Sequence, residues 1–138
     1  MFVRWQKRAR RRPAYGGMWE WVDGKSIPPP ADTHWAASLV ESRRIDGKPR
    51  QRHVAYLGGI CQSAIDLDTP HQRGHFWVRV VGRLDQLANQ ITPEQRRKIE
   101  TQIAAKVTPP TSEDIEQINA SLEGYGFPPI GLVPVDPV

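Results

Sequence analysis

The stretch LVESRRIDGKPRQRHVAYLGG, residues 39–59, constrains the fold most, because it places an Asp-Gly pair between two strand-like segments. Asp46-Gly47 tolerates the positive φ angles of a type I′ turn and is a strong signal for a two-residue β-hairpin. We therefore expect a hairpin over residues 35–57, with a further strand in the N-terminal FVRW, residues 2–5. The pairs that this turn predicts are Ile45 with Lys48, Arg43 with Arg50, Glu41 with Arg52, Leu39 with Val54 and Ala37 with Tyr56.

Alternation of side chains across these strands separates the base of the hairpin from its tip. Near the base, one face contains Leu39, Val54 and Tyr56, which we expect to anchor the hairpin to a core. Near the tip, the side chains are mostly cationic. Pro49 has no N–H to offer a neighbouring strand, so this end of the second strand should be a free edge. The base would serve the fold, and the tip would face a partner.

Positive charge is concentrated in the first half of the chain. Residues 1–60 contain twelve Lys or Arg and five Asp or Glu, a net charge of +7, whereas residues 61–138 have a net charge of −3. Such asymmetry favours a polyanionic partner. A two-stranded ribbon fits the major groove of DNA, where arginine binds guanine edges or phosphates. The residues that we predict to contact nucleic acid, with DNA favoured over RNA, are Arg43, Arg44, Lys48, Arg50, Gln51, Arg52, Arg8, Arg10, Arg11 and Arg12.

Other interpretations of these features stay open. The hairpin charges could protect a solvated edge strand from aggregation, and the basic run over residues 4–12 could be an arm along DNA or a plain basic tail. Trp19 and Trp21 could stack on bases or lie in the core. The chain could also be a protein-interaction module, such as a phage or plasmid inhibitor or a subunit of a larger complex, or an RNA- or ribosome-associated protein.

The second half of the chain indicates helices. After a loop, residues 74–91 repeat apolar side chains at the spacing of one helix face. Two shorter helices follow, with capping residues Thr92 and Gln95 and then Thr111 and Asp114, and Gly124 would end the second. The predicted fold class is α+β, a small antiparallel sheet packed on the helix at 74–91. We divide the chain into a basic β-ribbon region (1–60), a helical region of the same domain (61–124) and a Pro-rich tail (125–138), a candidate surface for a protein partner.

The sequence contains no catalytic or cofactor pattern. His71 and His75 have the spacing of a helical metal pair, but no second His or Cys pair completes a site, so we interpret them as a coincidence. The only cysteine, Cys61, excludes a disulfide within the chain and suits the cytoplasm. No apolar run approaches the roughly 20 residues of a membrane span. We expect a cytoplasmic, non-enzymatic protein without cofactor, metal or membrane partner.

The string LVESRRIDGKPRQRHVAYLGGI, residues 39–60, together with Phe2, Val3 and Arg4, resembles a segment near the N-terminus of DDE-type transposases from bacterial insertion sequences. There an F-V-R strand leads into LVES-R-(D/N)GK-RQR-(V/I)-YLG. The resemblance implies a small N-terminal β-sheet that helps to grip transposon or target DNA. Such transposases continue into an RNase H-like domain with three metal-binding carboxylates, whereas residues 61–138 indicate helices, so transposase activity is not implied.

Residues 60–138 are also similar to the remainder of short uncharacterised proteins of α-proteobacteria that share this start. This second resemblance adds a lineage but no function. We expect a bacterial protein that is linked to a mobile element or to transcriptional control.

Overall fold

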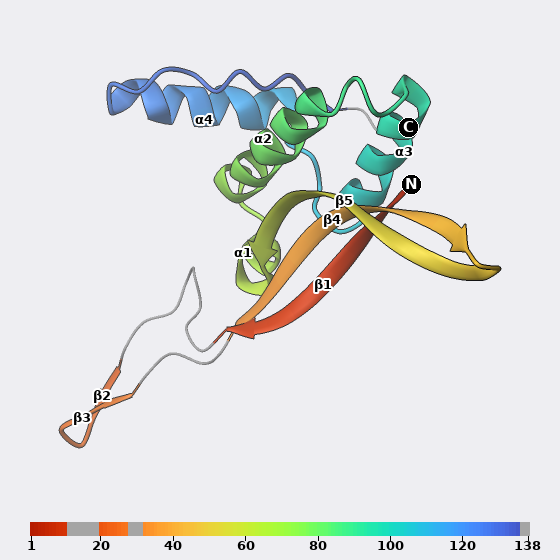
Figure 1. The fold of residues 1–138 in the computed structure, drawn as a ribbon. Coiled ribbons are helices and arrows are strands. Elements are labelled where there is room, and N and C mark those ends of the chain that lie inside the picture. Colours follow the sequence, from red (N-terminus) through yellow and green to blue (C-terminus); the bar gives the residue numbers. More distant parts are fainter. Residues whose placement is uncertain (11–19, 28–31, 136–138) are drawn as a thin grey trace.

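The computed structural model describes residues 1–10, 20–27 and 32–135, and in this part of the chain it shows a three-stranded sheet, a two-stranded sheet and four helices. This confirms the predicted α+β class. Figure 1 shows the helices on one side of the three-stranded sheet. The elements are β1 (Phe2–Arg10), β2 (Glu20–Val22), β3 (Lys25–Ile27), β4 (Asp32–Ile45), β5 (Lys48–Cys61), α1 (Gln62–Leu67), α2 (Pro70–Gln86), α3 (Pro93–Ala104) and α4 (Ser112–Gly124).

The three-stranded sheet is antiparallel, in the order β1-β4-β5. β1 pairs with β4 along its whole length, from Phe2 opposite Val40 to Arg10 opposite Asp32. The first strand is therefore longer than the predicted FVRW, and residues 6–10 of the basic run are paired backbone. The interpretation of that part as a free arm or tail is wrong, because the long β4 offers a partner for every residue of β1.

The predicted turn is confirmed, since Asp46 and Gly47 have φ angles of 54° and 75°. The predicted register also holds from Ile45 opposite Lys48 to Val40 opposite His53. Nearer the base it is wrong, because two register shifts leave Val54 and Leu57 without a partner in β4. These β-bulges turn Tyr56 away from the helices, with 51% of its surface exposed.

The core contact predicted for Tyr56 is taken by its neighbours. Ala55 and Leu57 are each 2% exposed, Leu39 is fully buried as expected, and Val54 packs against the core from a half-buried position. The strand edge at the tip is free as Pro49 predicts, since β5 is the outer strand of the sheet among the described residues.

The predicted helix at 74–91 occupies residues 70–86 instead. Thr69 caps its start, accepting from the N–H of Gln72, and the chain turns after Gln86. Leu87 and Ile91 are still buried, at 5% and 7% exposed. The apolar pattern therefore predicted correctly which side chains are buried, but not where the helix ends. The turn at 87–90 folds Leu87 and Ile91 back onto the core. The predicted loop before this helix contains α1.

Both predicted capping boxes are present. Thr92 and Gln95 exchange side-chain and backbone hydrogen bonds at the start of α3, and Thr111 and Asp114 do so at the start of α4. Gly124 is the last residue of α4, and the left-handed glycine after it is Gly126, with φ 78°. No helix among the residues that the structure describes has the length and apolarity to cross a bilayer.

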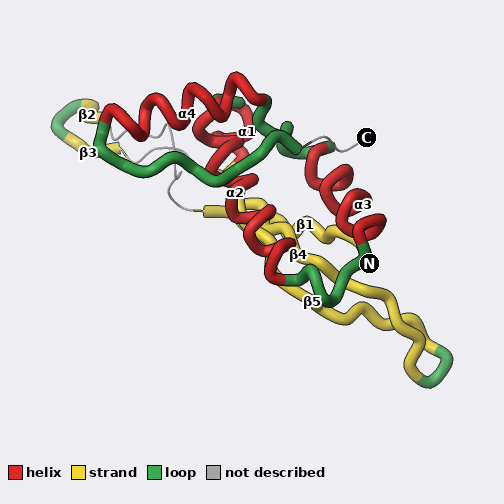
Figure 2. Tube along the Cα trace, turned by 90° about the horizontal axis from the view of Figure 1, so that it is seen from above, coloured by secondary structure: helices red, strands yellow, loops and turns green. Residues whose placement is uncertain are grey.

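The core lies between the helices and the face of the sheet that contains Ala37 and Leu39. α2 crosses above this face (Figure 2), and its Trp77 is fully buried with Nε1 donating to the Val107 carbonyl at 3.0 Å. In the Pro-rich tail, Leu132 is buried and the N–H of Ile130 donates to Asn119 of α4. The described part of the tail thus lies along the body of the protein.

Two tryptophans of the same face of the sheet surround a lysine. The Lys106 ammonium lies 3.4 Å from the ring centroid of Trp35 and 5.5 Å from that of Trp5. Burial, with the nearby Lys7, lowers the pKa of Lys106. This cation–π contact ties the connection after α3 to the sheet and occupies both rings.

We expect replacement of Asp114 by Asn to make the protein less stable at neutral pH but not in acid. Asp114 accepts from the Thr111 N–H at 3.0 Å and from Arg73 at 2.9 Å, which lowers its pKa below the ordinary 3.8. A lowered folded-state pKa stabilises the protein above the unfolded pKa, and this contribution is lost as pH falls through the folded pKa. Both side chains are only 13% exposed, so the loss at pH 7 should be about 1–3 kcal/mol.

Urea unfolding at pH 7 and at successively lower pH values measures this difference. Asp68, the other carboxylate on Arg73, is 63% exposed, and Asp68→Asn is the matched control, with an expected change below about 0.5 kcal/mol. A difference between Asp114→Asn and the parent that stayed constant down to pH 2 would contradict the assignment.

Candidate nucleic-acid interface

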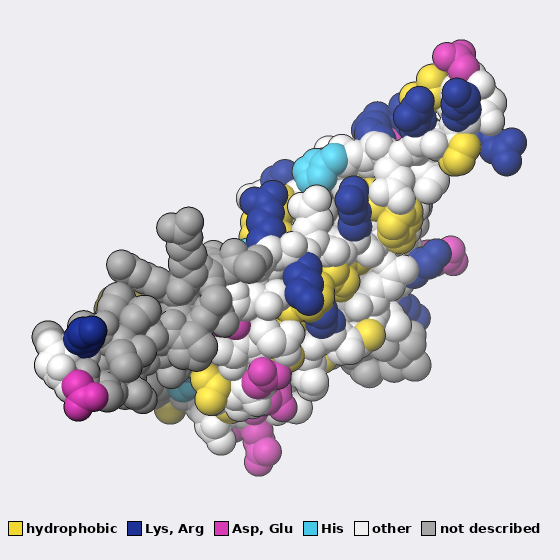
Figure 3. Space-filling model, turned by 90° about the horizontal axis from the view of Figure 1, so that it is seen from below, with side chains coloured by type: hydrophobic (Ala, Val, Ile, Leu, Met, Phe, Trp, Pro, Cys, Tyr) yellow, Lys and Arg dark blue, Asp and Glu magenta, His cyan; other side chains and the backbone are white. Residues whose placement is uncertain are grey.

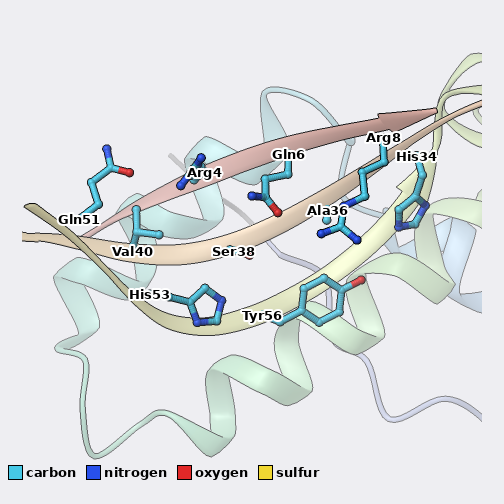
Figure 4. Close-up of a pocket in the computed structure, with 10 residues that line it drawn as sticks. All are labelled: Arg4, Gln6, Arg8, His34, Ala36, Ser38, Val40, Gln51, His53 and Tyr56. Carbon is cyan, nitrogen blue, oxygen red and sulfur yellow. The ribbon is translucent and has the colours of Figure 1, made fainter.

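The face of the sheet opposite the helices forms a shallow hollow of about 430 Å³. We call this surface the open face. Figure 4 shows its side chains, which come from all three strands. None of the ten described residues that line the hollow is acidic. They are Arg4, Gln6, Arg8, His34, Ala36, Ser38, Val40, Gln51, His53 and Tyr56.

Arginines line one border of the open face, and an aromatic side chain lies near its other border. Arg4 and Arg8 of β1 are exposed and form no ion pair with any described residue. The Tyr56 hydroxyl of β5 and the His34 ring of β4 both lie over the backbone of Gly59. A Cβ atom placed on this glycine would be 2.6 Å from each of them. His34 Nδ1 is also 3.8 Å from the Cys61 sulfur. The face thus combines free cations, hydrogen-bonding groups and an exposed ring.

Beyond the open face, the strands β4 and β5 continue as a two-stranded arm, residues 41–52. Every residue from 42 to 52 is exposed, and Figure 1 shows the arm projecting past the helices. Arg44 lies four residues after Val40 on β4. Because alternate residues of a strand point to the same side, Arg44 is on the same side of the sheet as the open face. Figure 3 shows Lys and Arg side chains spread over the open face and out along the arm.

The predicted contact residues of the arm fall into two groups. Arg43 and Arg52 both approach the same oxygen of Glu41, at 2.8 Å and 3.3 Å, so one carboxylate partly neutralises two cations. In contrast, Arg44, Lys48 and Arg50 form no ion pair within the described chain. Only this second group is free to bind an external anion without first breaking an internal pair.

The predicted contact residues of the N-terminal basic run have different outcomes. Arg8 lines the open face, and the backbone of Arg10 ends β1. Arg11, Arg12 and Trp19 lie outside the described residues, as does the side chain of Trp21. The structure therefore brings Arg8, Gln51 and Arg44 to one surface.

Sequence reasoning missed several residues of the open face: Gln6, His34, His53 and Tyr56. Arg4 belonged to the predicted basic run but was not selected as a contact. The period-two spacing of Arg4, Gln6 and Arg8 was an available signal, because alternate residues of a strand share a face. Tyr56 had no such signal, since its orientation depends on the bulges.

The structure shows no clustered metal ligands in residues 1–10, 20–27 and 32–135, where no three His, Cys, Asp or Glu side chains come together. His71 and His75 are both exposed on α2.

Comparisons with protein-family models, with curated proteins and with solved structures found no match for this chain. The resemblance to insertion-sequence transposases therefore stays a prediction, and the functional assignment depends on the geometry of the open face and the arm.

Proposed function

We propose that this protein is a non-enzymatic nucleic-acid-binding protein whose preferred ligand is double-stranded DNA. The supporting observation is a set of cations without carboxylate partners among the described residues, on the open face and on both faces of the arm. Arg4 and Arg8 lie on the open face, and Arg44, Lys48 and Arg50 lie on the arm. Unpaired surface cations bind phosphates by releasing the counterions that condense on nucleic acid.

The shape of the arm favours the duplex. A strand rises about 3.3 Å per residue, so the five residues of β4 from Glu41 to Ile45 extend about 17 Å. The DNA major groove is about 12 Å wide and 8.5 Å deep and admits a two-stranded ribbon. With the arm in the groove, Arg44 and Arg50 reach bases or phosphates, and Arg4 and Arg8 contact the neighbouring backbone. The proposal needs no cofactor, places the protein in the cytoplasm and is compatible with a role in a mobile element or in transcriptional control.

One observation favours a second candidate, single-stranded RNA. Tyr56 is a half-exposed ring beside His53 and Arg8, and unpaired bases stack on such rings. In that case Tyr56→Ala should weaken RNA binding by about 5- to 150-fold, as stacking of one base contributes about 1–3 kcal/mol. The duplex proposal expects little change, because bases in a duplex are already stacked.

A salt titration tests the proposed function. Fluorescence anisotropy with a labelled 20-base-pair duplex should show affinity that falls linearly on a logarithmic salt scale. The five unpaired cations predict a slope of about −4 to −5, at about −0.9 per phosphate. Single-stranded RNA and a poly-glutamate chain serve as competitors. Absence of binding at 50 mM salt would exclude DNA, and tighter binding of RNA than of the duplex would favour the second candidate.

A further inference from the structure

The two outer strands of the sheet are protected differently. β1 has four Lys or Arg in its nine residues, and α3 covers part of its edge, where the Val3 N–H donates to Gln102 at 2.7 Å. On β5, Lys48, Pro49 and the arginines protect only the arm. The base of β5, residues 54–61, contains no charged side chain. The bulges at Val54 and Leu57 interrupt this edge, but without charges or Pro the strand still offers N–H and C=O groups to another strand.

A groove runs between the base of β5 and α2. It encloses about 470 Å³ and is lined on the strand side by Tyr56, Leu57, Gly58 and Gly59. On the helix side, Val78, Gly82 and Gln86 follow one another at i, i+4 and i+8, beside Arg79 and Arg83. The groove is thus a strand edge facing one stripe of a helix, which is the form of site in which an extended peptide adds a strand to a sheet.

The charges on the rim define the chemistry of the occupant. Neither Arg79 nor Arg83 pairs with a carboxylate in the described residues, and Arg83 donates only to the neutral Gln86. Val78 is 37% exposed between them and offers an apolar contact. An extended segment in the groove would present alternate side chains to this rim. Carboxylates fit the two guanidinium groups, and β-branched side chains fit Val78.

We propose that the groove between β5 and α2 binds an extended acidic peptide segment of a partner protein, added as a fourth strand beside residues 56–59. The groove lies at the β5 edge and the cations of β1 lie at the opposite edge of the sheet, so Tyr56 is the one described residue that lines both the groove and the hollow of the open face.

Gly82 allows a test that preserves the fold. It is exposed within α2, and a Cβ added there meets no atom within 4 Å. Leucine at this position is a better helix former than glycine and extends into the groove. We therefore expect Gly82→Leu to fold at least as stably as the parent. The matched control is Ala120→Leu, at an exposed position of α4 away from the groove.

The probe is a random heptapeptide library displayed on phage, selected against the immobilised full chain. Enriched sequences should alternate Asp or Glu with β-branched residues. A synthetic copy of one enriched peptide should bind Gly82→Leu and Arg79→Glu at least tenfold more weakly than the parent. Ala120→Leu and the Arg4→Ala/Arg8→Ala pair should bind it unchanged. Methylation of the backbone amides of the peptide should abolish binding at alternate positions only, as strand addition requires.

Several outcomes would overturn the proposal. These are no enrichment, enriched sequences that are basic, equal binding by Gly82→Leu, or a methylation pattern without alternation. Sedimentation of the parent alone identifies the rival occupant. A dimer that Gly82→Leu dissociates would assign the edge to a second copy of this chain and would exclude the peptide.

Discussion

Replacing Arg4, Arg8, Arg44 and Arg50 by alanine should weaken duplex DNA binding by about 10²–10⁴-fold at 0.1 M salt. Each of these guanidinium groups is exposed and lacks an ion-pair partner in the described chain. Four lost phosphate contacts should also reduce the steepness of the salt dependence by about 3 to 4. Fluorescence anisotropy at several salt concentrations measures both quantities, and circular dichroism verifies that the variant is folded.

The pairs Arg4/Arg8 and Arg44/Arg50 can be tested separately against a control of equal charge. Arg97 and Lys98 are exposed on α3, on the helix side of the molecule. Changing both to alanine removes two charges without touching the open face or the arm. If this pair lowers affinity as much as Arg4/Arg8 or Arg44/Arg50, binding depends on net charge alone, and the proposed interface is wrong.

A change at Glu41 should act in the opposite direction. Its carboxylate holds Arg43 and Arg52 at 2.8 Å and 3.3 Å. Glu41→Gln removes a negative charge from the arm and releases both cations to bind phosphate. We expect tighter DNA binding and a steeper salt dependence, whereas an arm that does not contact DNA would give no change.

The largest loss of stability is expected for Trp77→Ala, at about 3–5 kcal/mol. Trp77 is fully buried at the centre of α2. Its ring packs edge-to-face on that of Phe76, with 6.3 Å between the ring centroids, and its Nε1 donates to the Val107 carbonyl. Truncation leaves a cavity and an unpaired buried carbonyl. Domains of this size are stable by only about 5–15 kcal/mol, so this loss is a large fraction of the total free energy of unfolding. Urea unfolding followed by circular dichroism measures the change.

Two further substitutions separate the causes of this loss. Trp77→Phe keeps an aromatic ring but removes the hydrogen bond and should destabilise by about 1–3 kcal/mol. Val78→Ala changes the next residue, which is 37% exposed, and should have an effect below about 1 kcal/mol. A loss below 1 kcal/mol for Trp77→Ala would show that α2 is not the centre of the core.

The features predicted correctly from the sequence are those determined within a few residues. The Asp46-Gly47 turn requires two left-handed residues, and the boxes Thr92–Gln95 and Thr111–Asp114 close over three residues. Pro49 correctly marks a strand with no outer neighbour among the described residues. Each depends on backbone geometry or on a missing N–H, so neighbouring residues are sufficient to specify it.

The open face was only partly predictable for a different reason. Side chains in a strand have a period of two, so a slip of one residue exchanges the faces. The bulge at Val54 produces such a slip and places Tyr56 on the open face, and the bulge at Leu57 reverses it, so that Gly58 lies against Phe76 and Val80 of α2. The pair Gly58-Gly59 in β5 is a general signal for an irregular strand, but it does not specify at which residues the register shifts.

By itself, the sequence determined the hairpin turn, the register of its tip, the helix caps and the excess of positive charge in the first half. Only the tertiary structure decided that residues 6–10 belong to a strand, that Arg4 and Arg8 share a face with Gln51, and that Glu41 pairs with Arg43 as well as with the predicted Arg52. The physical reason is the distance along the chain over which each interaction acts. Turns and caps depend on interactions between residues that are close in the sequence. Strand pairing, bulges and ion pairs depend on partners that are distant in the chain.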